Sequence, residues 1–418
     1  MTGKEHVVLI VGGGIGGLTL ALFLHQAGIR CRVFEAAQEV KPLGVGINIL
    51  PHATRELGRF GIPAEMLKVA FEPAGSGFYS CLGQHIMTEP AGRAAGYEWP
   101  QISIHRADLH AILLAKVEER LGAAAVRLGH RFERADQDDG GVTIHFAPTA
   151  DGTTPRPARG TVAIGCDGVL SALRRQLYPD EGPPRFAGIN MWRGVTKSKP
   201  FLDGRIVVRA GGLKPAKMVI YPVRRFPDGD HLINFTAEVE MDVKRQNDWS
   251  TPGRLEDFLH FYEDWRFDWL DVPQLLKNAD FILEYPMVDR APLKRWSFGR
   301  VSLLGDAAHP MYPRGGNGSA QSILDANVLA RWLAQLADPV AALQAYEKER
   351  LPYTSSVVEM SHHQPPDRVI GRVEELTGGK RFGRIEDVIA LDELKAISGQ
   401  YARVAGYDLS AANKPFPR

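Results

Sequence analysis

The segment Val7–Val11, followed directly by Gly12-Gly13-Gly14-Ile15-Gly16-Gly17, decides the fold of this chain. Five consecutive aliphatic residues are typical of a strand buried on both faces of a parallel sheet. The glycines match the pattern G-x-G-x-x-G, and Leu18–Ala27 after them is predicted to be a helix that ends at Gly28. A second strand is expected at Cys31–Glu35. The N-terminus therefore predicts a β-α-β unit that binds a dinucleotide.

The glycines of this motif have different expected roles. Gly12 permits the tight turn, Gly14 lets the backbone approach a pyrophosphate, and Gly17 allows the strand and the helix to pack closely. Glu35 lies eighteen residues after Gly17, where its carboxylate can accept hydrogen bonds from a ribose. The motif alone does not distinguish FAD from NAD. The residues expected to bind the dinucleotide here are Gly12, Gly14, Ile15, Gly16, Gly17, Glu35 and Ala36.

The composition is that of an ordinary globular chain and excludes several classes of function. The 418 residues are 44% hydrophobic and 24% charged, with a net charge of +1, so no bulk charge favours nucleic acid or an anionic membrane. Cys31, Cys81 and Cys166 are far apart and predict neither a disulfide framework nor a redox pair. No metal site is expected, because the adjacent His362 and His363 would point apart on a helix. The first apolar stretch is too short for a signal sequence or a membrane span. We expect a cytoplasmic monomer or homodimer with no nucleic-acid or membrane partner.

Two further segments each follow a predicted strand. The first is Gly165–Arg174 (GCDGVLSALR), and the second is Gly305–Pro310 (GDAAHP), which continues through Pro313–Gly318 (PRGGNG) into a long helix. In this order and at these distances, they and the N-terminal motif resemble the class A flavoprotein monooxygenases, aromatic hydroxylases with a p-hydroxybenzoate-hydroxylase-like fold. The resemblance covers nearly the whole chain, including Tyr346–Pro352.

The resemblance implies a particular cofactor and reaction. FAD would be the bound cofactor, and NADH or NADPH and O₂ would be co-substrates. NAD(P)H would reduce the flavin, and the flavin C4a-hydroperoxide would then hydroxylate a small aromatic substrate. The sequence has no second G-x-G-x-x-G motif and no visible separate NAD domain, so NAD(P)H is expected to bind transiently.

The expected fold is α/β, with a Rossmann-like FAD-binding domain interrupted by an antiparallel-sheet substrate domain and followed by a C-terminal helical segment. Between about residues 186 and 285, alternating strands replace the β-α pattern, and a helix is expected at Arg254–Trp265. The expected parts are residues 1–71, 99–184 and 286–350 for the FAD-binding domain, 72–98 and 185–285 for the substrate domain, and 351–418 for the tail.

The resemblance also assigns roles to individual residues. Asp306 matches the aspartate that hydrogen-bonds the ribityl chain of FAD. The glycine loop before the long helix would aim backbone N–H groups at the flavin N1–C2=O edge. Pro313 lies in that loop beside the flavin. His309 is a candidate for proton transfer, although a structural role in its turn is favoured. No side chain is expected with certainty to be catalytic, since the flavin performs the oxygen chemistry. The other residues matched to FAD or nicotinamide contacts are Val45, Gly46, Arg106, Asp167, Gly168, Arg174, Gly316 and Gly318.

Within the family, five segments resemble the 5-methylphenazine-1-carboxylate 1-monooxygenases: 42–49 (PLGVGINI), 103–106 (SIHR), 191–195 (MWRGV), 285–290 (YPMVDR) and 311–313 (MYP). They imply an N-heteroaromatic carboxylate as substrate, with hydroxylation that replaces the carboxylate. An anionic substrate favours a bidentate arginine, for which Arg193 and Arg314 are candidates. Tyr221, Met191 and Trp192 are candidate ring contacts. For each of these five, a structural role in the sheet or loop is the competing interpretation.

Two alternatives stay open at this point. One is hydroxylation of another aromatic compound, such as a salicylate-like, hydroxybenzoate, quinolone, urate or polyketide substrate. The other is a flavin-binding protein that does not turn over.

Overall fold

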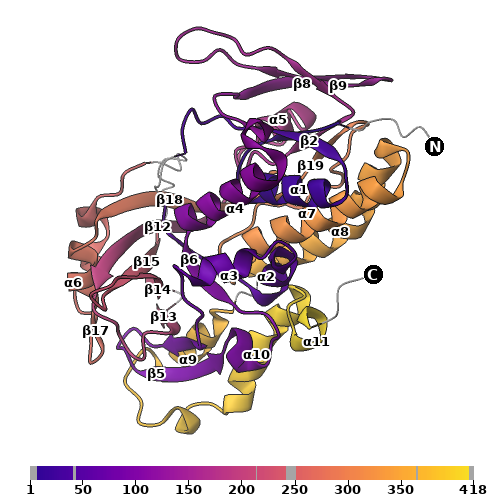
Figure 1. The fold of residues 1–418 in the computed structure, drawn as a ribbon. Helices are drawn as coiled ribbons and strands as arrows, with labels where there is room; N and C mark the ends of the chain where they lie inside the picture. The colour runs from indigo at the N-terminus through magenta and orange to yellow at the C-terminus, as the bar shows by residue number, and fades with distance from the viewer. Residues whose placement is uncertain (1–6, 41–43, 213, 242–250, 364–365, 414–418) are drawn as a thin grey trace.

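The computed structural model describes residues 7–40, 44–212, 214–241, 251–363 and 366–413. Pro42 and Leu43 of the 42–49 segment lie outside these ranges. Two main sheets organise the described residues, with the C-terminal helices packed beneath the second sheet (Figure 1). This arrangement confirms the predicted α/β fold.

The first sheet is parallel, and its strand order is β19-β11-β1-β2-β7. The central strand β1 is buried along Val8–Val11, as a strand covered on both faces must be. One face is covered by a helical layer, and a small antiparallel sheet of β8, β9 and β10 covers the other (Figure 1). The parallel strands are β1 (Val7–Val11), β2 (Arg30–Phe34), β7 (Val126–Arg127), β11 (Val162–Gly165) and β19 (Val301–Leu303); the small sheet has β8 (Phe132–Asp138), β9 (Gly141–Phe146) and β10 (Ala158–Gly160).

Helix α1 (Ile15–Gln26) lies at the centre of the helical layer, between α4 (Arg106–Leu121) and α7 (Gly318–Gln335). It begins three residues before the predicted start, because the end of the glycine turn already adopts helical geometry. Further strands and helices around this sheet and its helical layer are β3 (Gly46–Ile49), β6 (Ile102–His105), α2 (Pro51–Gly58), α3 (Ile62–Leu67), α5 (Ala172–Leu177) and α8 (Pro339–His363).

The second sheet has the strand order β18-β12-β15-β14-β13-β4-β5. All neighbours are antiparallel except β13 and β4, which pair in parallel. Its two faces differ. The outer face carries an apolar core around Trp192, and on the inner face Arg193 and Asn234 contact the backbone of Gly46. The strands are β4 (Gly75–Tyr79), β5 (His85–Pro90), β12 (Arg185–Ser198), β13 (Ile206–Gly211), β14 (Ala216–Arg225), β15 (His231–Glu240) and β18 (Phe281–Asp289).

The helix predicted at Arg254–Trp265 is wrong. That stretch forms two 3₁₀ turns, Leu255–Asp257 and Leu259–Phe261, with hydrogen bonds from residue i+3 to residue i. Tertiary contacts override the helical pattern here, since the hydroxyl of Tyr262 donates to two carbonyls of the sheet at 2.9 Å each. Phe258 stacks on Trp192 with ring centroids 4.9 Å apart.

The C-terminal segment consists of α9 (Arg368–Thr377), α10 (Leu391–Val404) and α11 (Leu409–Ala412). Val369, Ile370 and Val373 of α9 pack against Phe78 of β4, so the segment extends the core of the second sheet. None of the helices in the described ranges is long and apolar enough to cross a membrane.

Candidate active site

A cavity of about 410 Å³ lies at the carboxyl ends of the parallel strands. This edge of an open parallel sheet is where nucleotides bind in doubly wound folds. Residues at or just beyond four strand ends contribute to it, and loops, the first turns of helices and the start of β8 supply the remainder. The lining residues that the sequence predicts as cofactor contacts are Gly12, Gly14, Ile15, Gly16, Glu35, Ala36, Arg106, Asp167, Gly168 and Asp306.

The glycine turn divides into packing and ligand-facing positions. Gly12 has φ +105°, and a Cβ there would lie 2.4 Å from the carbonyl oxygen of Cys166. A Cβ on Gly17 would lie 2.0 Å from the carbonyl oxygen of Gly12, and Gly17 does not line the cavity. Apart from Gly14 itself and its two chain neighbours, no described atom lies within 4 Å of a Cβ built on Gly14. The open space at Gly14 is therefore the place where a ligand can approach the backbone.

Two carboxylates at the cavity are held by backbone N–H groups. Glu35 accepts from the N–H of Gly13 and of Ala37, each at 2.8 Å. Asp167 caps α5, because its Oδ2 accepts from Ala172 N at 2.7 Å and from Leu173 N at 3.1 Å. Burial raises the pKa of Asp167, although these bonds and one from Ser171 oppose the shift. Both carboxylates thus hold the turns around the cavity in place.

Asp306 follows β19 and lines the same cavity as the glycine turn. It is exposed to the cavity, yet desolvation by the surrounding protein raises its pKa, against the opposing charges of His309 and Arg106. Arg106, Arg131 and Arg175 also line the cavity. Three guanidinium groups and the start of α1 give this region the donors and positive charge that a pyrophosphate requires.

Several residues that line the cavity were not predicted from the sequence. His130 and Arg131 reach it because the N–H of Gly129 donates to Ala37 O and that of His130 to Glu35 O, both at 2.8 Å. No local motif marks this loop. The further lining residues that the sequence did not predict are Val11, Phe34, Phe132, Cys166, Leu170, Ala172, Arg175, Leu304, Gly305, Ser319 and Ser322.

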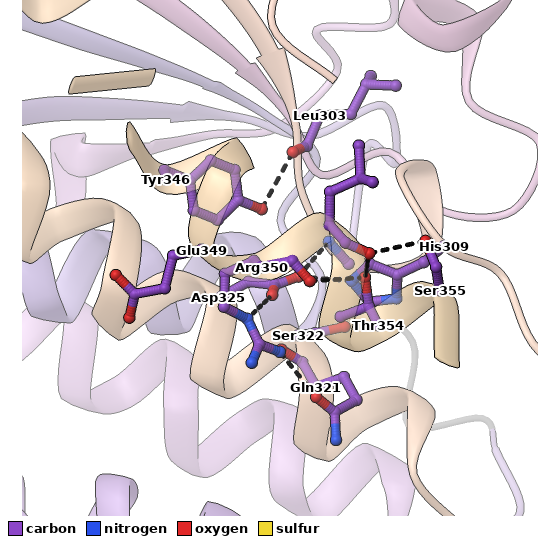
Figure 2. Close-up of polar contacts among 12 residues, drawn as sticks. Leu303, His309, Gln321, Ser322, Asp325, Tyr346, Glu349, Arg350, Thr354 and Ser355 are labelled. Carbon is purple, nitrogen blue, oxygen red and sulfur yellow. Dashed lines mark hydrogen bonds and ion pairs between the residues drawn. The ribbon is translucent and has the colours of Figure 1, made fainter. Parts of the chain in front are cut away.

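Arg174 and His309 lie beside the cavity instead of lining it. The guanidinium of Arg174 is buried, pairs with Glu181 and donates to Ala307 O and Ala308 O at 3.0 and 2.9 Å. Nε2 of His309 lies 2.6 Å from Oδ2 of Asp325 (Figure 2). Both side chains therefore support the turn that carries Asp306.

Asp325 is the centre of a buried polar network behind that turn. Its Oδ1 accepts from Nε of Arg350 at 2.6 Å, and its Oδ2 also accepts from Gly305 N at 3.2 Å (Figure 2). Arg350 continues to Oε1 of Gln321 at 2.7 Å. Burial by itself would raise the pKa of Asp325, but His309 and Arg350 hold it below its usual value. The network ties α7 and α8 to the Asp306 turn.

The remaining predicted cofactor residues lie around a second loop and strand. The Gly46 N–H donates to Oδ1 of Asn234 at 2.7 Å, and a Cβ at Gly46 would meet Asn234 at 2.7 Å. Val45 O accepts from the N–H of Arg106 at 2.9 Å. A Cβ at Gly318 would lie 3.5 Å from Oδ1 of Asp306, so the loop before α7 adjoins the cavity. Gly316, at φ +67°, lies in that loop, and its N–H donates to Pro313 O at 3.2 Å.

Of the predicted substrate residues, Met191, Arg193 and Tyr221 share the inner face of the second sheet. The strand register sets this, because Asn234 of β15 pairs with both Tyr221 and Val195, and Arg193 is two residues before Val195. Nη2 of Arg193 donates to Gly46 O at 2.8 Å. Burial raises the pKa of Tyr221, with Arg193 opposing.

The structure separates the other two substrate candidates from this group. Trp192 is fully buried on the outer face, since neighbouring residues of a strand point to opposite faces. Arg314 lies in the loop before α7 and lines a small recess with Lys217 and Glu238. Met191, Arg193 and Tyr221 thus share the inner face of the sheet, whereas Trp192 lies on the opposite face.

The donors of this site fit FAD. The open glycine turn and the three guanidinium groups suit a pyrophosphate, and the carboxylates suit hydroxyl groups of a ribose or ribityl chain. In the described part of the chain, no three His, Cys, Asp or Glu side chains cluster as metal ligands would. The cavity at the carboxyl edge of the parallel sheet therefore has the donors and acceptors to hold a redox cofactor.

Comparisons with known proteins agree with this geometry. The family model described as "FAD binding domain" matches residues 5–261 and 266–361. A curated relative, phenazine 1,6-dicarboxylic acid hydroxylase PhzS of Lysobacter antibioticus, is 43% identical over 86% of this chain and 89% of its own. The 6-hydroxynicotinate 3-monooxygenase of Bordetella bronchiseptica is 30% identical over 91% of this chain and 99% of its own.

A solved structure shares the fold. Klebsiella pneumoniae HpxO, complexed with FAD and uric acid, superposes with a TM-score of 0.75 at 23% identity, covering 96% of this chain and 97% of that one. This chain belongs to the FAD binding domain family and, within it, to the class A FAD-dependent aromatic monooxygenases.

Proposed function

We propose that this enzyme uses NAD(P)H and O₂ to hydroxylate an N-heteroaromatic carboxylate, with a phenazine carboxylate as the preferred substrate class. The observation that carries the proposal is the state of Arg193. It pairs with no carboxylate among the described residues, and its Nε is buried without a hydrogen-bond partner there. Arg193 is partly buried, and a guanidinium in this state is stabilised by an anionic ligand.

The surroundings of Arg193 support an aromatic ligand with hydrogen-bond acceptors. Nδ2 of Asn234 is a second buried donor without a described partner. Burial raises the pKa of Tyr285, with Arg193 opposing, so its hydroxyl stays protonated at neutral pH. Met191 and Tyr312 pack with Tyr285 in one apolar cluster. These contacts suit a flat ring that carries a carboxylate and ring nitrogens.

The chain's own residues would bind and orient the substrate, and keep water from the reacting ring. FAD, when bound, supplies the redox chemistry by taking two electrons from NAD(P)H and activating O₂. In a decarboxylative reaction, one oxygen atom enters the ring as hydroxyl and the other leaves as water. The carboxylate leaves as CO₂, and NAD(P)H is oxidised to NAD(P)⁺. The 43% identity to a phenazine dicarboxylate hydroxylase supports this substrate class.

The experiment measures NADH and NADPH oxidation by the FAD-loaded enzyme with phenazine-1-carboxylate, phenazine-1,6-dicarboxylate, 6-hydroxynicotinate and 3-amino-4-hydroxybenzoate. We expect strong stimulation by a phenazine carboxylate and a hydroxylated product by mass spectrometry. Release of CO₂ distinguishes replacement of the carboxylate from hydroxylation elsewhere on the ring. Stimulation by a benzoate or pyridine alone would contradict the phenazine assignment, and no stimulation by any compound would favour a flavin-binding protein without turnover.

A further inference from the structure

The loop between Met311 and α7 is supported from outside the FAD-binding domain by the C-terminal helix α10. Tyr401 of α10 is fully buried and packs with Val357 of α8 and with Ala405. A Cβ at Gly315 would lie 2.4 Å from Cε1 of Tyr401, so the aromatic ring lies directly against the loop backbone. Gly315 has φ +82°, a conformation that glycine adopts without strain.

The hydroxyl of Tyr401 holds both sides of Gly315. It donates to the carbonyl oxygen of Arg314 at 3.1 Å and accepts from Nδ2 of Asn317 at 3.4 Å. Ser361 of α8 provides a third partner at 3.0 Å. Since Asn317 and Ser361 are fully buried, loss of the hydroxyl leaves their polar groups without this partner.

The loop leads directly to the cavity. Asn317 is the N-cap of α7, and Ser319 in the first turn of that helix lines the cavity beside Asp306. The first N–H groups of a helix have no partner within it, and its N-terminus carries partial positive charge. The N-terminus of α7 would stabilise a cofactor that gains negative charge in the cavity. This stabilisation would be stronger the closer the helix start is held to the cofactor.

Asn317 also connects the loop to the buried network described above. Its Oδ1 accepts from Nε2 of Gln321 at 3.3 Å, and Gln321 binds Arg350. The Tyr401 hydroxyl is thus the C-terminal end of a chain of polar contacts that reaches the Asp306 turn through Asp325.

We propose that Tyr401 is a positioning residue that sets the reduction potential of the bound FAD. It does so by fixing the start of α7 against the cavity from the C-terminal segment. The proposal rests on FAD binding and not on the identity of the aromatic substrate.

The test compares the full-length, FAD-loaded Tyr401→Phe and Tyr97→Phe variants without aromatic substrate. Tyr97 is a matched control because its hydroxyl also ties down the C-terminal segment, donating to Tyr407 O at 2.5 Å, but does not contact the loop. We expect Tyr401→Phe to weaken the preference for reduced over oxidised FAD by about tenfold. For a two-electron couple, that lowers the midpoint potential by about 30 mV. Tyr97→Phe should leave the potential unchanged.

Equal potentials in the two variants would overturn the proposal, even if both lose thermal stability. If Tyr401→Phe does not take up FAD, Ser361→Ala removes a partner of the same hydroxyl from the neighbouring helix. A lowered potential in Ser361→Ala is then the expected result, and an unchanged one would overturn the proposal. Because no aromatic compound is present, failure of the substrate assignment would not alter either result.

Discussion

Oδ1 of Asp325, in the middle of α7, lies 2.6 Å from Nε of Arg350 on α8, and both side chains are almost completely buried (Figure 2). The other oxygen of Asp325 binds His309 and Gly305 N. The two helices and the Asp306 turn are therefore held by one carboxylate. A buried carboxylate with this many partners is stabilising only while all of them are present.

The first prediction concerns this pair. Asp325→Asn leaves the Arg350 charge buried without its carboxylate, and we expect a loss of about 3–5 kcal/mol in the free energy of unfolding. Glu349→Gln is the control, because the Arg331–Glu349 pair is partly exposed and should cost less than about 1 kcal/mol. Urea denaturation of both variants measures the difference. Similar losses in the two would contradict the role of Asp325.

The second prediction concerns pH and His52. Burial, together with Arg350 and Arg55, lowers the pKa of His52 to about 3, while Asn317 opposes the shift. In the unfolded chain this residue titrates near the ordinary histidine pKa of 6.5, so the unfolded state binds more protons between the two values. The contribution of neutral His52 to the free energy of unfolding is therefore fully present above about pH 6.5. It falls as the pH drops toward 3, by up to about 1.4 kcal/mol per pH unit.

His52→Phe removes this titration and keeps the stacking on Tyr407, whose ring centroid lies 5.5 Å away. We expect a shallower dependence of the unfolding free energy on pH between about 6.5 and 4 than in the unchanged protein. The exposed His25→Gln should leave the slope as it is. An unchanged slope in His52→Phe would mean that His52 is not held neutral in the fold.

The third prediction separates two glycines of the N-terminal motif. Gly14→Val places a side chain in the open space at the cavity, so the protein should fold normally. FAD should bind at least about tenfold more weakly, because the side chain blocks the approach to the backbone and a tenfold change corresponds to losing about 1.4 kcal/mol of contact energy. Gly17→Ala places a Cβ 2.0 Å from Gly12 O and should lower thermal stability. FAD titration and thermal unfolding of the FAD-free proteins test the contrast. Undiminished FAD affinity in Gly14→Val would contradict the placement of the cofactor.

The fourth prediction concerns Arg193. Hydrogen bonds to charged groups contribute about 1.5–3 kcal/mol, so Arg193→Met should raise KM for a carboxylate substrate by about 10- to 100-fold. The neutral carboxamide analogue should be affected much less, which separates loss of charge recognition from loss of the Gly46 contact. Steady-state kinetics with both compounds measure this. Equal effects on acid and amide would contradict a carboxylate partner for Arg193.

Local patterns were sufficient to predict the cofactor half of the fold. The aliphatic run Val7–Val11 and the glycines after it predict a buried parallel strand followed by a helix, as the structure shows. Asp306 follows a predicted strand, but its role as an FAD contact is what the family resemblance implies and not what a local pattern predicts. Arg131 was missed, since its loop is brought to the cavity by backbone bonds to residues almost a hundred positions earlier.

Side-chain roles that depend on sheet register or distant packing could not be predicted from sequence alone. Trp192 and Arg193 are neighbours in the sequence, but the register of β12 sends them to opposite faces. The 254–265 stretch has a helical pattern that aromatic packing overrides. Tyr401 lies in a tail with no recognisable motif, and only the fold brings it to Gly315.

The most direct test of the account is one turnover experiment with isotopically labelled O₂. The FAD-loaded enzyme is supplied with NADH and phenazine-1-carboxylate, and the product is analysed by mass spectrometry. The account predicts substrate-stimulated NADH oxidation and one labelled oxygen atom in a hydroxylated aromatic product. NADH oxidation that yields only hydrogen peroxide with every aromatic carboxylate tested, and no labelled product, would contradict it.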